Sequence, residues 1–441
     1  MGLLLRVPNT VFTSLLENIG LSSQGFKHHP PEGFMLNKKL NKSNKLAIIV
    51  IGSGSVGVRF VNELIYKQPG AFIKVFGGEE QQPYSRENLT KLLSGDLTEE
   101  RLYSTNKIHE SKNTQVFLNN PIVEVDTKNN IVIDSHGEQH AYEKLVLAVG
   151  SFPRNMDIPG TDLKHVFTFR NIQDAEMLKN RQISSRKTVV VGGGLVGLDA
   201  AYAMKQYNTE VVVIENSTRL MYQLLDDHAS VYLRLYLDDL DIDVRIETDI
   251  TSIEGKNKVE KVTLSNGETI ECDTVIISIG IIPNTDLAKN IGLKINRGIV
   301  VDDFLKTSVE NIYAIGECAE HRDRIYGIVQ PGFDQAATLA KIIAGGKSKY
   351  TGTTTASQLR VVEYPVLSIG DNGEGDAVNK EIMYRDIRKM IYRKIVLKHG
   401  HLTGVIATGP WKNSKNLHEL VEKKQFIWPW KRSKFERTGE L

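Results

Sequence analysis

Two short stretches of the sequence have the residue types and spacing to bind phosphate groups. One reads IVIGSGSVG (49–57) and the other VVVGGGLVG (189–197), so each is an apolar run that ends in G-x-G-x-x-G. In such a turn the backbone N–H groups at the start of a helix can bind the pyrophosphate of a dinucleotide. The glycines at the G positions of the motif are Gly52, Gly54 and Gly57 in the first stretch and Gly192, Gly194 and Gly197 in the second.

An acidic residue follows each turn at a distance typical of ribose recognition. Glu79 lies 22 residues after Gly57 and Glu215 lies 18 residues after Gly197, and a carboxylate there accepts hydrogen bonds from ribose hydroxyls. The charge of Glu215 also disfavours a 2′-phosphate, which favours NADH, while the nearby Arg219 keeps NADPH open. The alternative is that either glutamate is only a solvated strand end.

The same succession of strand, helix and strand surrounds both turns. A continuous apolar run before each turn is typical of a parallel strand that is buried on both faces, and apolar residues at helical spacing follow each turn. In the first copy we predict strands at 46–51 and 73–76, with a helix between them that ends at QPG. In the second copy we predict strands at 188–191 and 210–214, with a helix at 198–206 between them.

Two dinucleotides are therefore expected, and FAD with NADH is the economical pair because hydride passes readily between flavin and nicotinamide. The predicted fold is α/β, with two Rossmann-like domains, the second inserted in the first, and a C-terminal α+β interface-like domain after a linker. The predicted limits are 46–165 and 286–345 for the FAD-binding domain, 166–285 for the NAD(H)-binding domain and 355–441 for the C-terminal domain. Residues 1–45 are read as a disordered extension or a mis-assigned start, or alternatively as a small docking helix.

The composition excludes several classes of protein. The 441 residues carry a net charge of +2, which indicates neither a nucleic-acid nor a membrane partner. The two cysteines, Cys272 and Cys318, exclude a disulfide scaffold, a four-cysteine metal site and a local C-x-x-C pair, so no bound metal is expected. His399 and His401 share one turn, and two ligands do not make a site. A cytoplasmic protein is predicted.

Four further stretches match one known family. They are FGGEEQQPYSRENLTKLLSG, KLVLAVGSFPR, VIISIGIIPNT and NIYAIGECAEHRDRIYGIVQPGFDQA. With the two glycine turns they make the chain resemble the FAD-dependent pyridine nucleotide–disulfide oxidoreductase class. Within it the chain resembles the flavoprotein part of the large subunit of NADH-dependent assimilatory nitrite reductase, and the rubredoxin and ferredoxin reductases. The resemblance covers about residues 46–345 and, more weakly, the C-terminal segment.

The resemblance implies roles for several residues. Glu79 would hold the adenosine ribose of FAD, and Arg86 and Lys91 would lie along the cofactor. Lys91 would also stabilise reduced, anionic flavin, or alternatively only contact a phosphate or the solvent. Glu317 would bind the flavin ribityl chain at the start of a helix. Ala148, Gly150 and Gly280 would also bind cofactor. They lie in KLVLAVGSFPR and VIISIGIIPNT, where a strand ends near a glycine and the chain crosses from one domain to the other.

The sequence also departs from this family in three ways. No cysteine precedes position 272, which excludes thiol–disulfide chemistry. Asp199 stands where the family usually has a glutamate near the nicotinamide, so its catalytic role is open. The chain lacks the cysteines that would bind iron–sulfur or sirohaem groups. Electrons are therefore expected to pass to rubredoxin, ferredoxin or a separate iron–sulfur or sirohaem subunit.

Two other functions stay open at this point. DQAATLA (334–340) weakly resembles a segment of membrane NADH:quinone reductases, and an NADH-sensing flavoprotein similar to apoptosis-inducing factor would also fit. The C-terminal QFIWPWKRSKFERTGEL mixes aromatic and basic residues. It is read as packed on its own domain, as a dock for an acidic electron carrier or as a membrane contact, which is not favoured. A homodimer is possible, and no nucleic-acid partner is expected.

Overall fold

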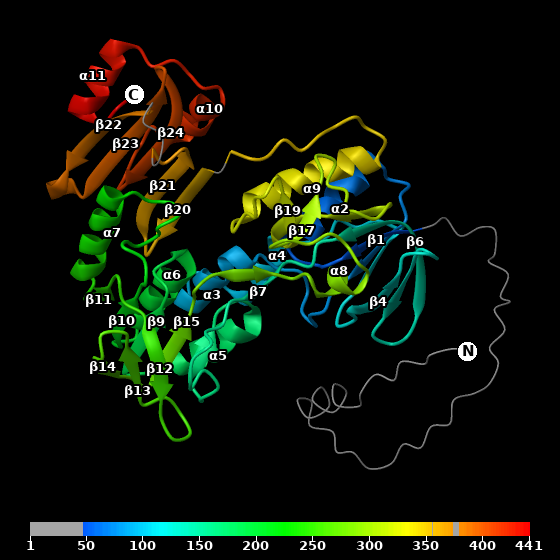
Figure 1. Cartoon of the computed structure of the whole chain (residues 1–441), viewed down its shortest axis with the longest axis horizontal. Helices are drawn as coiled ribbons and strands as arrows, with labels where there is room; N and C mark the ends of the chain where they lie inside the picture. Colours follow the sequence, from blue (N-terminus) through cyan, green and yellow to red (C-terminus); the bar gives the residue numbers. More distant parts are fainter. Residues whose placement is uncertain (1–46, 355, 374–378) are drawn as a thin grey trace, which may run out of the picture. The chain divides into compact units, whose positions relative to one another are not determined.

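The first glycine turn follows a central strand of a seven-stranded sheet (Figure 1). The computed structural model describes residues 47–354, 356–373 and 379–441. Strand β1 (Ala47–Ile51) is buried along its whole length and pairs in parallel with β2 (Ile73–Phe76) and β6 (Gln139–Leu147). A continuous apolar strand suits this place because both faces of the sheet are covered.

The remaining strands of this sheet extend it on both sides. Strand β3 pairs in parallel with β2, and β18 with β6, while the turns at DTKNN and DSHGEQ join β4, β5 and β6 as antiparallel hairpins. Helix α2 begins after Gly54, ends before QPG and packs against α9. The bounds are β3 (Thr114–Phe117), β4 (Ile122–Asp126), β5 (Ile131–Asp134), β18 (Ile312–Ala314), α2 (Ser55–Lys67) and α9 (Val329–Ile343).

The second glycine turn follows a strand of a five-stranded parallel sheet with the order β11-β10-β9-β15-β8. Helix α6 starts at Leu195, three residues before the predicted 198, because Gly194 is its N-cap. The strands are β8 (Val166–Thr168), β9 (Lys187–Val191), β10 (Glu210–Ile214), β11 (Ile242–Arg245) and β15 (Thr274–Ile277). The helices are α5 (Ile172–Gln182), α6 (Leu195–Lys205) and α7 (Asp227–Asp239), and an antiparallel sheet adds β12 (Ile250–Glu254), β13 (Lys261–Leu264) and β14 (Thr269–Glu271).

Short elements connect the two sheets. Strands β7 (Ser151–Pro153) and β16 (Ile281–Pro283) form an antiparallel pair where the chain passes from one sheet to the other and back. Between β2 and β3 the chain forms η1 (Arg86–Asn88), α3 (Leu89–Ser94) and α4 (Glu99–Ser104), and α3 contacts both α5 and α6. After β16 come α8 (Asp286–Asn290), β17 (Ile299–Val301), η2 (Gly316–Cys318) and β19 (Ala319–His321).

The prediction that Glu317 lies at the start of a helix is wrong. Glu317 belongs to the single 3-10 turn η2, which leads directly into strand β19, and α9 begins only at Val329. The cause is Glu320, whose carboxylate accepts hydrogen bonds from the backbone N–H groups of Arg297 and Gly298 at 2.8 Å each. These bonds hold 319–321 as a strand beside β17.

A five-stranded antiparallel sheet with the order β20-β21-β24-β23-β22 forms the C-terminal domain. Its central hairpin turns at His399 and Gly400, as predicted. The strands are β20 (Ala356–Val361), β21 (Tyr364–Gly370), β22 (Asn379–Asp386), β23 (Ile391–Lys398) and β24 (His401–Thr408). The helical segments are η3 (Ile387–Lys389), η4 (Ser414–Asn416), α10 (Leu417–Glu422) and α11 (Pro429–Thr438).

The sheets are consistent with the predicted order of domains, whose limits stay our proposal. The predicted N-terminal extension, 1–45, lies outside the described residues. Among the described residues no helix has both the length and the apolar character needed to cross a membrane.

Candidate functional site

The three glycines of the first turn have different structural roles. Gly52 has φ +118°, and a Cβ there would lie 2.1 Å from the carbonyl oxygen of Ala148. A Cβ on Gly57 would lie 2.1 Å from the carbonyl oxygen of Gly52. A Cβ on Gly54, in contrast, would have no protein atom within 4 Å. Gly52 and Gly57 are therefore required by the fold, whereas Gly54 leaves open space at the start of α2.

The second turn repeats this geometry closely. Gly192 has φ +112°, and its Cβ would lie 2.2 Å from the carbonyl oxygen of Ser278, which corresponds to Ala148. A Cβ on Gly197 would lie 2.1 Å from the Gly192 carbonyl oxygen, and one on Gly194 would again meet nothing within 4 Å. Two equivalent cradles thus lie at the carboxyl ends of parallel strands in two sheets, where such folds bind nucleotides.

Both cradles open onto helix N-termini that have no side-chain cap. The N-cap residues are Gly54 for α2 and Gly194 for α6, both extended, and neither first turn contains an acidic residue. The first N–H groups of a helix need acceptors from outside the helix. Each cradle therefore suits a pyrophosphate, because it offers open space, N–H donors and the positive end of a helix dipole.

Glu79 lies in a polar cluster beside the first cradle. Its carboxylate accepts a hydrogen bond of 2.7 Å from the Tyr84 hydroxyl and an ion pair from Arg86. The Arg86 guanidinium also donates to the backbone oxygen of Arg170 at 3.1 Å. The Tyr84 hydroxyl accepts from the N–H of Ile172 at 3.2 Å, and burial raises the pKa of this phenol. The predicted residues Glu79 and Arg86 are therefore held together, across the junction with β8 and α5.

Arg170 is a candidate residue that the sequence analysis missed. Its guanidinium pairs with Glu317 and donates to the Ser151 hydroxyl at 2.8 Å, and that hydroxyl donates to Glu317 at 2.8 Å. Its Nε atom is buried without a partner, and a buried donor without an acceptor is costly. A ligand with oxygen acceptors would satisfy it. Its signal in the sequence is limited to a basic residue two positions after the end of β8, where the chain enters the second domain.

Lys91 and Asp199 approach each other from the two nucleotide-binding domains. Lys91 is exposed on α3, whereas Asp199 is partly buried in the second turn of α6. The Asp199 carboxylate accepts a hydrogen bond of 3.1 Å from the N–H of Val362, in the turn between β20 and β21. Burial raises the pKa of the Asp199 carboxyl to about 6, against the opposing effects of the hydrogen bonds from Val362 and Thr90 and the charge of Lys91.

Glu215 closes the second cradle at the end of β10. Its two carboxylate oxygens accept the N–H groups of Gly193 at 2.6 Å and Ser217 at 2.7 Å. Arg219 is turned away from this place: its side chain donates to the Leu225 carbonyl at 2.8 Å, pairs with Asp227 at 2.9 Å and lies over the Tyr222 ring. The arginine that left NADPH open in the sequence is thus engaged elsewhere, which supports NADH.

The substitution Glu215→Gln tests this arrangement. An amide has one oxygen acceptor, so a backbone N–H or a ribose hydroxyl loses its partner, and kcat/KM for NADH is expected to fall roughly tenfold. The loss of the negative charge is expected to reduce the preference for NADH over NADPH, because the carboxylate no longer repels the 2′-phosphate. The matched control is Glu210→Gln, at the exposed start of the same strand, where Glu210 pairs with Lys187. The assignment would be contradicted if Glu215→Gln had the same kcat/KM as the wild type for NADH and the same kcat/KM as the wild type for NADPH.

The remaining predicted residues lie in the two segments that connect the nucleotide-binding domains. Ala148 and Gly150 follow β6, and Gly280 follows β15. Gly150 has φ +67° and Gly280 φ +102°, and a Cβ on either would meet no atom within 4 Å. The backbone oxygens of Gly150 and Gly280 accept from Asn284 and Arg154, which ties the strands of the crossing together. Both glycines thus lie at the link between the nucleotide-binding domains.

Neither cysteine has the properties of a reactive thiol. Cys272 and Cys318 are both buried and free. Burial raises the pKa of the Cys272 thiol to about 12 and that of the Cys318 thiol to about 11. A nucleophilic or redox-active cysteine needs the thiolate form, so both are packing residues.

One group of described residues has the composition of a metal site: Asp134, Glu138 and His140. The Asp134 oxygens and both ring nitrogens of His140 are already engaged. The Asp134 oxygens accept from the N–H groups of His136 and Glu138, from Asn120 and from His140, all at 2.9–3.0 Å. The other nitrogen of His140 faces the ammonium of Lys74 at 3.2 Å. This network joins β5, β6 and β2, and we interpret it as structural.

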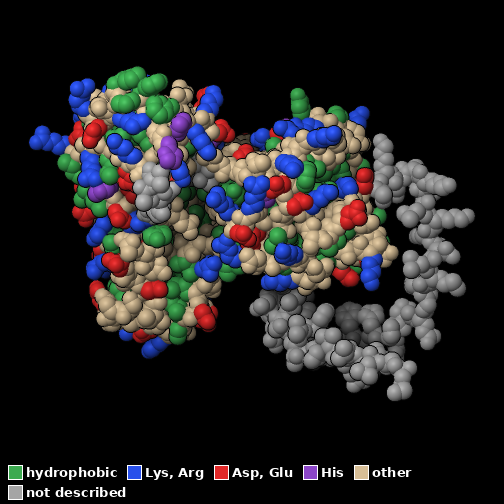
Figure 2. Space-filling view, turned by 45° about the horizontal axis from the view of Figure 1, so that its top comes forward, with side chains coloured by type: hydrophobic (Ala, Val, Ile, Leu, Met, Phe, Trp, Pro, Cys, Tyr) green, Lys and Arg blue, Asp and Glu red, His purple; other side chains and the backbone are tan. Residues whose placement is uncertain are grey.

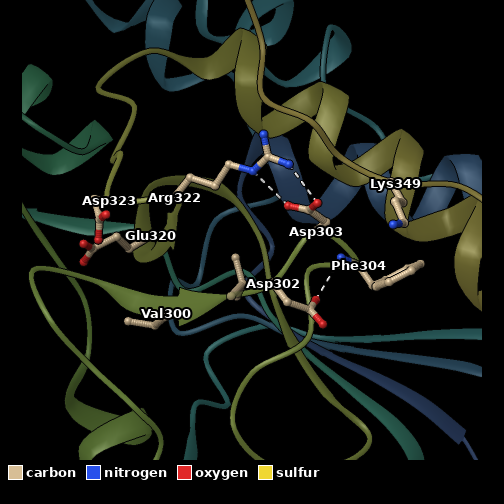
Figure 3. A pocket seen from close by; sticks show the side chains of 9 residues that line it. Val300, Asp302, Asp303, Phe304, Glu320, Arg322, Asp323 and Lys349 are labelled. Carbon is tan, nitrogen blue, oxygen red and sulfur yellow. Dashed lines mark hydrogen bonds and ion pairs between the residues drawn. The ribbon is translucent and has the colours of Figure 1, made fainter.

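A cavity of about 460 Å³ lies apart from both cradles, beside β17 and β19 (Figure 3). Arg322 and Asp303 pair across it at 2.8 Å, and the Lys349 ammonium stands over the Phe304 ring. It contains none of the predicted site residues, and its mixed charges indicate no ligand class. The lining residues are Val300, Val301, Asp302, Asp303, Phe304, Glu320, Arg322, Asp323 and Lys349.

The fold and the two cradles are those of a protein that binds two dinucleotides, and the chain belongs to the pyridine nucleotide-disulphide oxidoreductase family, whose model matches residues 46–338. Residues 356–425 match the C-terminal domain of rubredoxin NAD+ reductase. The chain is 35% identical over 387 residues to a nitrite reductase [NAD(P)H] from Bacillus subtilis, covering 87% of this chain and 48% of that protein. It is 34% identical over 318 residues to a rubredoxin-NAD(+) reductase from Ectopseudomonas oleovorans, covering 70% and 81%.

Solved structures share the fold. A ferredoxin reductase from Rhodopseudomonas palustris superposes with a TM-score of 0.75 at 24% identity, covering 82% of this chain and 91% of that one. A putidaredoxin reductase bound covalently to putidaredoxin gives 0.75 at 24% identity, covering 86% and 92%. The chain spans about half the length of the nitrite and nitrate reductase relatives that it matches.

Proposed function

We propose that this protein is an NADH-dependent FAD oxidoreductase that passes electrons to a separate redox protein. The observation that carries the proposal is the pair of equivalent cradles, at Gly54 and Gly194, with the β7–β16 crossing between their domains. One cradle would hold FAD permanently, and the other would receive NADH. Bound FAD would accept a hydride from NADH and release the two electrons singly.

The residues of this chain would bind and orient the two nucleotides. Glu79, Arg86 and Arg170 would hold the FAD ribose and phosphates, and Glu317 would accept from its ribityl hydroxyls. Glu215 would hold the NADH ribose. Lys91 would supply a positive charge on the flavin side, with Asp199 acting on that charge from α6. These roles are predictions for the named residues, and each can be tested singly.

The proposal of an external acceptor rests on two features of the described residues. Both cysteines are buried with raised pKa values, and the group of described residues with the composition of a metal site, Asp134, Glu138 and His140, belongs to the hydrogen-bonded network between β5, β6 and β2. An external carrier would therefore have to take electrons from the flavin itself. The similarity to a rubredoxin-NAD(+) reductase supports rubredoxin or ferredoxin, and the similarity to nitrite reductases supports a separate iron–sulfur or sirohaem subunit. A cytoplasmic location and a homodimer are part of the same proposal.

Anaerobic stopped-flow mixing tests the function in two steps. NADH is expected to bleach the flavin absorbance rapidly, and mixing the reduced protein with rubredoxin or ferredoxin is expected to restore it rapidly. A soluble quinone and oxygen serve as comparison acceptors. Fast bleaching followed by a persistent charge-transfer band, with no competent protein acceptor, would overturn the proposal in favour of an NADH sensor.

A further inference from the structure

The end of the C-terminal domain carries an unusually exposed aromatic surface. The side chains of Trp428 and Trp430 are 50% and 63% exposed, and their rings stack with centroids 5.0 Å apart. The Phe426 ring packs edge-on against Trp428 at 5.2 Å. Trp411, the third tryptophan, is buried. Large aromatic side chains normally leave water on folding, so a contiguous exposed group of rings indicates a surface that is covered by something else.

Basic residues surround these rings. Residues 423–434 contain Lys423, Lys424, Lys431, Arg432 and Lys434 and no Asp or Glu. Arg432 lies over the Phe426 ring and donates to the carbonyl of Ile427, and Lys423 pairs with Glu419. Lys424, Lys431 and Lys434 are exposed, and none has an acidic partner among the described residues. In Figure 2 hydrophobic side chains lie among those of Lys and Arg over this part of the protein.

This aromatic-basic patch (Phe426, Trp428, Trp430, Lys424, Lys431 and Lys434) lies far from the nucleotide-binding domains. The first residues of β23 face α7, where the Tyr392 hydroxyl donates to Asp226 at 2.7 Å. The other end of the β23–β24 hairpin meets the patch, where Ile427 donates to the Gly400 carbonyl at 2.9 Å. Eight residues of β23 separate these ends, which is roughly 25 Å at the rise of a strand.

The chain's own features limit what could cover the patch. A second copy related by a two-fold axis would bring the same three lysines against one another, which is electrostatically unfavourable. A redox protein that docked here would remain distant from the cradles. Of the six patch residues only Lys424 lies within a matched family segment, because these segments end at residues 338 and 425. A second copy of the chain and a redox protein are therefore both disfavoured as occupants of the patch.

We propose that the aromatic-basic patch attaches the protein to the surface of an anionic lipid bilayer. Indole rings prefer the depth of the lipid headgroups, and neighbouring lysines are attracted to anionic lipids. The attachment is peripheral: two rings at the start of α11 enter the headgroup region while the nucleotide-binding domains remain in water. This inference is independent of the acceptor proposed above.

Vesicle sedimentation of the FAD-loaded full chain tests the attachment. The protein is expected to sediment with phosphatidylcholine vesicles that contain phosphatidylglycerol and to stay in solution with phosphatidylcholine alone. Combining Trp428→Ala with Trp430→Ala is expected to lower the partition coefficient at least roughly tenfold. Combining Lys431→Glu with Lys434→Glu is expected to lower it as well and to flatten its dependence on salt.

The control variant is Tyr66→Ala, which removes an 83% exposed aromatic ring from α2. It is expected to bind vesicles as the wild type does, and all variants are expected to keep NADH-dependent flavin reduction, which shows that they fold. Equal binding to both kinds of vesicle, no binding to either, or binding that survives loss of both tryptophans would overturn the proposal. A wild-type dimer that becomes monomeric on loss of the tryptophans would instead identify the patch as a subunit interface.

Discussion

Gly194→Ala is expected to fold with its full content of FAD and to bind NADH roughly ten- to a hundredfold more weakly than the wild type. The added methyl group meets no protein atom within 4 Å, so the backbone has no reason to move. It would instead occupy the place where the pyrophosphate must approach the N-terminus of α6. The loss corresponds to about 1.4 to 2.7 kcal/mol of binding free energy.

Gly192→Ala provides the contrast within the same turn. Its methyl group would lie 2.2 Å from the Ser278 carbonyl oxygen, at a backbone φ of +112° that alanine rarely adopts. This variant is expected to destabilise the second domain, whereas Gly194→Ala is not. The two glycines thus separate a requirement of the fold from a requirement of the ligand.

Titration of the oxidised holoprotein with NAD+, followed through the flavin spectrum, measures the dissociation constant. Gly70→Ala is the matched control, because a Cβ there also meets nothing within 4 Å but lies in the loop after α2, away from both cradles. If Gly194→Ala bound NAD+ as tightly as Gly70→Ala does, the pyrophosphate would have to lie elsewhere. The corresponding variant of the first turn, Gly54→Ala, is expected to lose FAD for the same reason.

The two cradles also explain how much the sequence could reveal. The turns at Gly52 and Gly192 were predictable because their strands, glycines and helices are adjacent in the chain, and the apolar runs read directly as buried strands. The match to the family then indicated Glu79, Arg86 and Lys91. These features depend on short-range patterns, and local sequence is sufficient to define them.

Contacts between distant segments were not predictable in the same way. Arg170 meets Glu317 across 147 positions, and no local pattern distinguishes Arg170 from other basic residues. The 3-10 turn at Glu317 was mistaken for the start of a helix because the strand that follows it depends on Glu320 contacting 296–298. The exposure of Trp428 and the burial of Trp411 likewise depend on how α11 packs on the sheet.

Asp199 illustrates the same limitation and leads to a second large effect. The sequence left its role open because aspartate is one methylene shorter than the glutamate usual in the family. In the structure it reaches the N–H of Val362 in the C-terminal domain, 163 positions away. Val362 and Glu363 have φ values of +55° and +66°, and a β-branched residue is strained in this region. The tight turn that aims this N–H at Asp199 therefore has an energetic cost that the contact helps to offset.

Asp199→Asn is expected to stabilise the protein increasingly as the pH rises from about 4 to about 6. The folded-state pKa of Asp199 is about 6, raised from 3.8, so between these values the folded protein binds more protons than the unfolded chain does. The contribution of Asp199 to the free energy of unfolding of the wild type is therefore greatest at low pH. It falls as the pH rises through about 6, by at most about 3 kcal/mol. Asparagine stays neutral and keeps an oxygen for the Val362 N–H, so it avoids that loss.

The melting temperature of the holoprotein, measured across this pH range, gives the result. The difference between Asp199→Asn and wild type is expected to be near zero at pH 4, to grow up to about pH 6 and then to level off. Asp199→Leu separates charge from hydrogen bonding: it has no acceptor, leaves the Val362 N–H unpaired and is expected to be less stable than Asp199→Asn at every pH. A constant difference across the range would mean that Asp199 does not titrate there.

The same titration is expected to appear in the reaction, because the ionised Asp199 acts on the charge of Lys91. The rate of flavin reduction by NADH is expected to change with an apparent pKa near 6 in the wild type and to be flat across that range in Asp199→Asn. A purely structural contact would alter stability without moving this kinetic pKa. The turn at Val362 would then be a way for the C-terminal domain to influence the nicotinamide side of the site, through one carboxylate that all three domains contact.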